Sequence, residues 1–87
     1  MKDRAPVALI TGAAGGIGES LVKVFSEAGY RVIATDCTER CNQLSNVSYL
    51  LVDLECFVND IGYADAMSVQ ILDLIGNHGL NALINNA

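Results

Sequence analysis

Glycines follow a short apolar segment in a pattern that could bind a phosphate group, and three of the four have the informative spacing. The segment Thr11–Gly18 comes directly after the apolar residues Val7–Ile10 and contains Gly12, Gly16 and Gly18. A glycine-rich turn lets backbone N–H groups approach an anion, and the N-terminus of a following helix adds a partial positive charge. The loop therefore predicts a site for the pyrophosphate of a dinucleotide. A purely structural turn is the alternative interpretation.

An acidic residue ends the next apolar segment and supports the dinucleotide interpretation. Asp36 directly follows Val32–Thr35. In a dinucleotide-binding unit, a carboxylate at this place accepts hydrogen bonds from both hydroxyls of the adenosine ribose, and its charge repels a 2′-phosphate. We therefore expect Asp36 to favour NAD over NADP. The alternative is that Asp36 only begins a loop.

The order of the expected elements places these residues at one edge of a sheet. Apolar runs predict strands at 7–11, 31–36, 48–53 and 82–84. Apolar residues at spacings of three and four predict helices at 17–28 and 59–76. Strands that alternate with helices imply a parallel sheet with right-handed crossovers. We therefore expect an α/β fold, namely part of a Rossmann-type doubly wound parallel sheet with strand order 3-2-1-4.

Each expected helix has one apolar stripe that would pack on the sheet. The stripe of the first helix comprises Ile17, Leu21, Val24, Phe25 and Ala28. The stripe of the second comprises Ile61, Ala64, Met67, Ile71, Leu72 and Ile75. Asn59 or Asp60 is expected to cap the start of the second helix, and Gly29 to end the first in a left-handed conformation.

The composition fits one small domain and argues against two other classes of protein. The chain has 87 residues, a net charge of −5, 52% hydrophobic residues and 17% charged residues. Such a balance suits a parallel sheet buried on both faces, and it offers no basic surplus for binding nucleic acid. No apolar run approaches the roughly 20 residues of a membrane span. We expect no nucleic-acid or membrane partner.

The cysteines predict neither a disulfide framework nor a metal site. Cys37, Cys41 and Cys56 are odd in number, and no histidine lies near the first two. Free thiols in a reducing cytosol are the simplest interpretation. With no separate apolar signal segment before the first strand, we expect a cytoplasmic protein without a bound metal.

The loop and two further motifs resemble the short-chain dehydrogenase/reductase family. The family signature T-G-x-x-x-G-x-G matches Thr11–Gly18, and Asn85-Asn86-Ala87 is similar to the start of the family's N-N-A-G motif. Asp53-Leu54 matches the place where members have an acid beside the adenine ring. The resemblance implies that residues 1–87 are the N-terminal part of a single NAD(P)-binding domain, ending before its catalytic elements. Glu55–Asp60 is interpreted as an insertion.

The same resemblance implies a set of cofactor-binding residues. In the loop these are Gly12, Ala14, Gly16, Ile17 and Gly18, which would cradle the pyrophosphate and the adjoining ribose. Asp53 would accept a hydrogen bond from the adenine amino group, with the Leu54 backbone beside it. Asn85, Asn86 and Ala87 would line the ribose side and brace the fourth strand against the first. Apart from the resemblance, Thr11 could bond across to the end of the fourth strand; the alternative is that this β-branched residue simply suits a strand.

The family's reaction implies an activity that these residues alone cannot perform. Members transfer hydride between NAD(H) and an alcohol or carbonyl carbon with a Ser and a Tyr-x-x-x-Lys pair. Here Tyr30, Tyr49 and Tyr63 all lack a lysine four residues on, so we expect no catalytic residue in 1–87. The first hypothesis is the NAD-binding portion of an NAD-dependent oxidoreductase acting on a small molecule, a dimer or tetramer when full length. The alternative is a non-catalytic dinucleotide-binding or interaction module.

Overall fold

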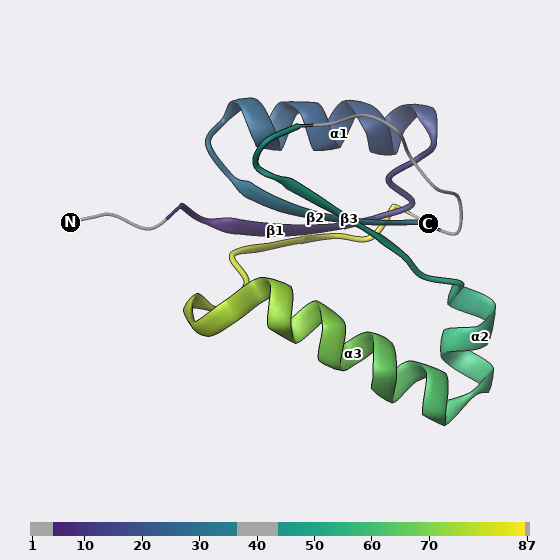
Figure 1. The fold of residues 1–87 in the computed structure, drawn as a ribbon. Coiled ribbons are helices and arrows are strands. Elements are labelled where there is room, and N and C mark those ends of the chain that lie inside the picture. Colours follow the sequence, from purple (N-terminus) through teal and green to yellow (C-terminus); the bar gives the residue numbers. More distant parts are fainter. Residues whose placement is uncertain (1–4, 37–43, 87) are drawn as a thin grey trace.

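Four parallel strands form one sheet in a computed structural model that describes residues 5–36 and 44–86. The elements, in chain order, are β1 (Val7–Thr11), α1 (Gly16–Glu27), β2 (Arg31–Asp36), β3 (Val47–Leu51), α2 (Leu54–Asn59), α3 (Ile61–Ile75), the 3₁₀ turn η1 (Gly76–His78) and β4 (Ala82–Ile84). The strand order is β3-β2-β1-β4, which confirms the predicted fold and strand order. Helix α1 covers one face of the sheet, and α3 lies on the other (Figure 1).

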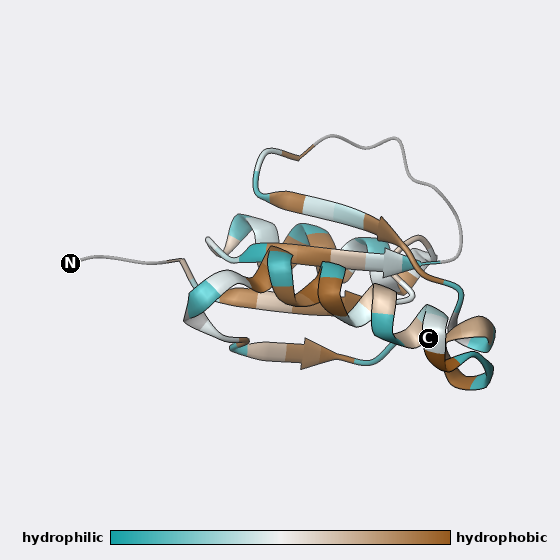
Figure 2. Cartoon of the chain, turned by 60° about the horizontal axis from the view of Figure 1, so that its bottom comes forward, coloured by the Kyte–Doolittle hydropathy of each residue, from teal (hydrophilic) through white to brown (hydrophobic). Residues whose placement is uncertain are grey.

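Strand β1 is central and aligns its neighbours. Ala8 pairs with Val32 of β2 on one side and with Ala82 of β4 on the other, all in parallel. Val7, Ala8 and Ile10 are fully buried, and the central strands are mostly hydrophobic (Figure 2). Because all four strands run the same way, the loops that follow them meet at one edge of the sheet.

The helices bury different residues from those that the spacing predicts. In α1, Gly18 and Val22 are the buried residues, with Leu21 and Phe25 packed against the core. The predicted stripe was wrong for Ile17 and Val24, which are 71% and 61% exposed, and for Ala28, which is also exposed. The physical reason is that Gly18 makes the closest contact of α1 with the end of β1. Because glycine has no hydrophobic side chain, an apolar stripe read from the sequence does not include it.

Helix α3 contacts the sheet mainly through its last turns. Ile71, Leu74 and Ile75 pack on Val7 and Ile33, whereas Ile61 and Leu72 of the predicted stripe are 82% and 63% exposed. Figure 1 shows the cause: α3 diverges from the sheet toward its N-terminal end, beside α2. The prediction was therefore right for Ile71 and Ile75, which pack on the sheet, and wrong for Ile61 and Leu72.

The segment between β3 and α3 also differs from its prediction. Strand β3 ends at Leu51, and the expected insertion at 55–60 contains most of the short helix α2. Asp60 caps α3 as expected, because its Oδ1 accepts a hydrogen bond from the Tyr63 N–H at 3.1 Å. Gly29 has a φ of 93°, in agreement with its predicted role after α1. Cys37 and Cys41 lie outside the described residues.

A cation that the sequence analysis did not single out connects β2 to α3. The Arg31 guanidinium donates to the Leu74 carbonyl, and its Nη2 donates to the Ile75 carbonyl at 2.7 Å. Carbonyls in the last turn of a helix lack intrahelical partners and carry a partial negative charge. Arg31 therefore both satisfies and neutralises the C-terminal end of α3.

Replacing Arg31 should consequently weaken the docking of α3. We expect Arg31→Met to lower the free energy of unfolding by about 1.5–3 kcal/mol, the range for hydrogen bonds to charged groups. Urea unfolding measures this. Lys23→Met, which removes a cation from the exposed face of α1, is the matched control and should change stability little. Equal effects of the two substitutions would contradict this role of Arg31.

Candidate cofactor-binding site

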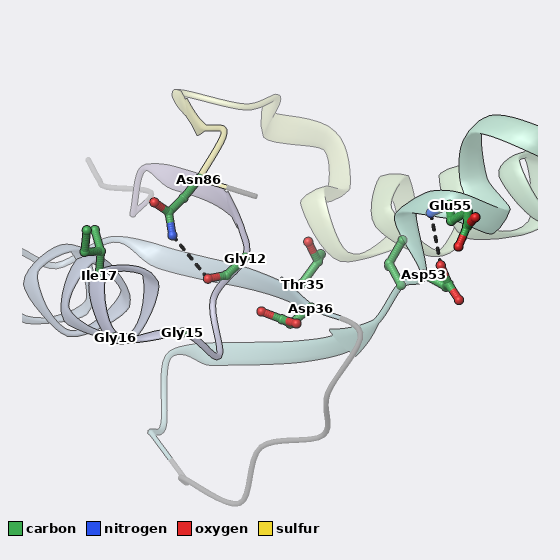
Figure 3. A pocket seen from close by; sticks show the side chains of 10 residues that line it. Gly12, Gly15, Gly16, Ile17, Thr35, Asp36, Asp53, Glu55 and Asn86 are labelled. Atoms are coloured by element: carbon green, nitrogen blue, oxygen red, sulfur yellow. Dashed lines mark hydrogen bonds between the residues drawn. The ribbon is translucent and has the colours of Figure 1, made fainter.

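A cleft of about 680 Å³ opens where the strands end (Figure 3). Six of the predicted site residues line it: Gly12, Gly16, Ile17, Asp36, Asp53 and Asn86. Sequence reasoning missed four others, which are Gly15, Thr35, Val52 and Glu55. Ligands of open α/β sheets bind outside the carboxyl ends of the strands, and this cleft has that position. Residues at or just beyond the carboxyl ends of all four strands therefore meet as the topology requires.

The structure gives a different reason for glycine at each of three loop positions. Gly12 has a φ of 63°, a left-handed conformation that favours glycine. A Cβ atom built on Gly18 would lie 2.0 Å from the Gly12 carbonyl oxygen and 2.9 Å from the Ala13 Cα. At Gly16, by contrast, an added Cβ would meet no heavy atom within 4 Å. Packing therefore requires glycine at position 18, whereas at position 16 the space is open beside the cleft.

The loop is tied to β2 by two hydrogen bonds. The Ala14 N–H donates to Asp36 Oδ2 at 2.9 Å, and the Ala13 N–H donates to the Thr35 carbonyl at 3.0 Å. Ala14, which the sequence analysis placed in the cofactor site, is not among the lining residues but contacts one of them. Asp36 thus supports the loop as well as lining the cleft (Figure 3).

Asp53 forms the wall of the cleft at the end of β3. Its Oδ1 accepts from the Glu55 and Cys56 N–H groups at 3.0 and 3.3 Å, and so caps α2. Its own N–H donates to the Tyr63 hydroxyl at 2.8 Å. Leu54 is the first residue of α2 and lies next to this wall in the chain. With Asp36, Asp53 and Glu55 in the lining and no basic residue among its described members, this end of the cleft is acidic.

The asparagines after β4 are bonded to the end of β1. The Thr11 hydroxyl accepts from the Asn86 N–H at 3.0 Å and lies 3.1 Å from Asn85 Oδ1, to which it can donate. Asn86 Nδ2 donates to the Gly12 carbonyl at 3.2 Å (Figure 3). The contact expected of Thr11 is therefore present, and Asn86 also fixes the first peptide of the loop. Ala87 lies outside the described residues.

Other groups near the cleft do not suggest different chemistry. Partial desolvation and the carboxylate of Asp53 raise the pKa of the Cys56 thiol, so this exposed cysteine is protonated at neutral pH and poorly nucleophilic. Within residues 5–36 and 44–86, no cluster of histidine, cysteine and acidic side chains could hold a metal ion. Nor does any helix in those ranges have the length and hydrophobicity to cross a membrane.

Comparison with known proteins places this fold and cleft in a family. Residues 6–87 match the family model described as short chain dehydrogenase. The chain belongs to this family of oxidoreductases, whose NAD-binding part has a Rossmann fold.

Individual relatives are similar over nearly the entire chain. An uncharacterized oxidoreductase of Schizosaccharomyces pombe is 40% identical over 93% of this chain, and an acetoacetyl-CoA reductase of Acinetobacter is 31% identical over 93%. The matched region is 29% and 35% of those proteins, so the chain spans about a third of their length.

Solved structures agree with the fold. An aldohexose dehydrogenase of Thermoplasma acidophilum aligns with a TM-score of 0.69 at 22% identity, covering 92% of this chain and 31% of the other. A short chain dehydrogenase of Leptospira borgpetersenii, solved with bound NAD+, aligns with a TM-score of 0.57 at 23% identity, covering 80% and 29%. At these identities the likeness concerns the fold alone.

The two loop glycines should respond differently to an added methyl group. We expect Gly18→Ala to lower the free energy of unfolding by about 1–3 kcal/mol, because the Gly12 backbone must move. Gly16→Ala should leave stability unchanged or raise it by up to about 1 kcal/mol, since alanine is the better helix former. Urea unfolding of both variants tests this, and similar losses at both positions would contradict the packing argument.

Proposed function

We propose that the chain binds NAD in this cleft and forms the NAD-binding portion of a short-chain oxidoreductase. The observation that carries the proposal is the position of Asp36, which lines the cleft beside the glycine-rich loop. A carboxylate there suits the two hydroxyls of an adenosine ribose and repels a 2′-phosphate. The absence of lysine and arginine from the described lining also favours NAD over NADP.

The pyrophosphate, the adenosine ribose and the adenine each have a candidate partner in the proposal. The pyrophosphate lies at the N-terminus of α1, where Gly16 leaves room and the helix contributes partial positive charge. The ribose lies against Asp36, and because a carboxylate has about four acceptor sites, it can serve the loop and the ribose together. Asp53 Oδ1 is committed to α2, so Asp53 Oδ2 is the atom that accepts from the adenine amino group, beside the Leu54 backbone.

For the whole protein we propose transfer of hydride between NAD(H) and an alcohol or carbonyl carbon of a small molecule. The bound nicotinamide supplies the redox chemistry, and the residues described above hold the pyrophosphate and the adenosine half of the cofactor. The family membership of the chain supports this activity. The proton-transferring Ser and Tyr-x-x-x-Lys are not in residues 1–87. A cytoplasmic homo-oligomer is part of the same proposal.

Removing the charge of Asp36 without removing its acceptor tests the cofactor preference. In Asp36→Asn the amide oxygen can still accept from the Ala14 N–H, so the loop is retained while the repulsion of a 2′-phosphate is lost. We expect the ratio of the NADP to the NAD dissociation constant to fall by about tenfold, or 1.4 kcal/mol. Isothermal titration calorimetry measures both constants.

The matched control for Asp36→Asn is Glu27→Gln, which neutralises an exposed carboxylate on α1 outside the cleft. It should leave the ratio of the two dissociation constants unchanged. If Asp36→Asn also left that ratio unchanged, Asp36 would be excluded from the ribose site.

The pyrophosphate position is tested by Gly16→Ala. Its methyl group occupies the open space at the start of α1, so we expect NAD to bind about tenfold more weakly, or 1.4 kcal/mol, while the fold is kept. Fluorescence titration with NADH measures the affinity. Unchanged affinity would favour the interpretation of the loop as a structural turn only.

A further inference from the structure

Tyr63 connects the first turn of α3 to the wall of the cleft. Its hydroxyl accepts a hydrogen bond from the Asp53 N–H at 2.8 Å, across ten residues of chain. Its own N–H donates to Asp60 Oδ1 at 3.1 Å. One residue thus joins the caps of α2 and α3, although its side chain does not line the cleft itself.

The backbone at Asp53 has few other restraints on its N-terminal side. The preceding Val52 N–H donates to the Asp36 carbonyl at 2.9 Å, the last such bond toward β2 before the chain leaves the sheet. After it, within residues 5–36 and 44–86, the Asp53 side chain and carbonyl bond forward to Glu55, Cys56 and Phe57 of α2. The Tyr63 hydroxyl is therefore the contact that fixes the Asp53 peptide relative to α3.

We propose, building on NAD binding in this cleft, that Tyr63 is a positioning residue for adenine recognition. By holding the Asp53 N–H, the Tyr63 hydroxyl sets the direction in which the Asp53 carboxylate faces the adenine amino group. A hydrogen bond requires both a short distance and good alignment. Loosening this peptide therefore weakens recognition of the amino group more than it weakens binding of the ribose or pyrophosphate.

Two ligands and one variant measure this effect. Tyr63→Phe removes only the hydroxyl. Nicotinamide hypoxanthine dinucleotide differs from NAD in carrying a carbonyl in place of the adenine amino group, which sets an acceptor against the Asp53 carboxylate. We expect the original chain to bind NAD about tenfold more tightly than this analogue, a difference of 1.4 kcal/mol, and Tyr63→Phe to reduce that preference to about threefold or less. Calorimetric titrations give the four dissociation constants.

Tyr30→Phe is the matched control, because it also removes only a tyrosine hydroxyl. Tyr30 precedes the first residue of β2, at the opposite end of the strand from the cleft, and its ring packs edge-on against Phe25. It should keep the full preference for NAD over the analogue. Amide hydrogen exchange adds a readout without ligand: the Asp53 amide should exchange at least several-fold faster in Tyr63→Phe than in Tyr30→Phe.

The outcomes separate this inference from the proposed function. An unchanged preference in Tyr63→Phe, or equal weakening of both ligands, would overturn the positioning role while leaving NAD binding intact. Equal binding of the two ligands by the original chain would overturn it as well, because Asp53 would then not recognise the amino group. If the original chain bound no NAD, the proposed function would fail, and the exchange rates would still report whether Tyr63 holds Asp53.

Discussion

The arrangement of the whole cleft depends on one close contact, that of Gly18 with the Gly12 peptide. With no side chain between them, α1 begins directly against the end of β1, and a Cβ at position 18 would lie 2.0 Å from the Gly12 oxygen. This contact directs the N-terminus of α1 toward the cleft, where the helix dipole has its positive end. It also explains why Val22 is buried and Ile17 is exposed: the rotation of the helix about its axis is fixed by its smallest residue.

The sequence predicted the strands and their order better than the details of the helices. Apolar runs such as Val7–Ile10 are unambiguous, because a buried parallel strand is hydrophobic on both faces. The helical stripes were less certain, since periodicity identifies an apolar face but not how far a helix stays in contact with the sheet. Ile61 is 82% exposed for that reason. Helix α2 was missed because it depends on the side-chain cap from Asp53, in a segment without a clear apolar period.

In the candidate site, too, some features were predictable from the sequence and others were not. The glycines and Asp36 were predictable, because a strand, a turn and an acid at the end of the next strand are all local signals. Long-range hydrogen bonds were not: no sequence pattern indicates that Arg31 bonds the end of α3 or that the Tyr63 hydroxyl meets the Asp53 N–H. The contact of Thr11 with the residues after β4 was predictable because the expected strand order had already placed the first and fourth strands side by side.

The hydrogen bond between the Ala14 N–H and the Asp36 carboxylate has a consequence for how this fold can evolve. Under the NAD binding proposed above, nucleotide preference and loop geometry depend on the same side chain. A substitution that introduced a cation at position 36 would gain attraction for a 2′-phosphate but would remove one of the two acceptors that tie the loop to β2. On this proposal, a change of cofactor leaves the Ala14 N–H without its acceptor unless a second substitution restores one. The two traits are linked through one carboxylate, which narrows the mutational paths between them.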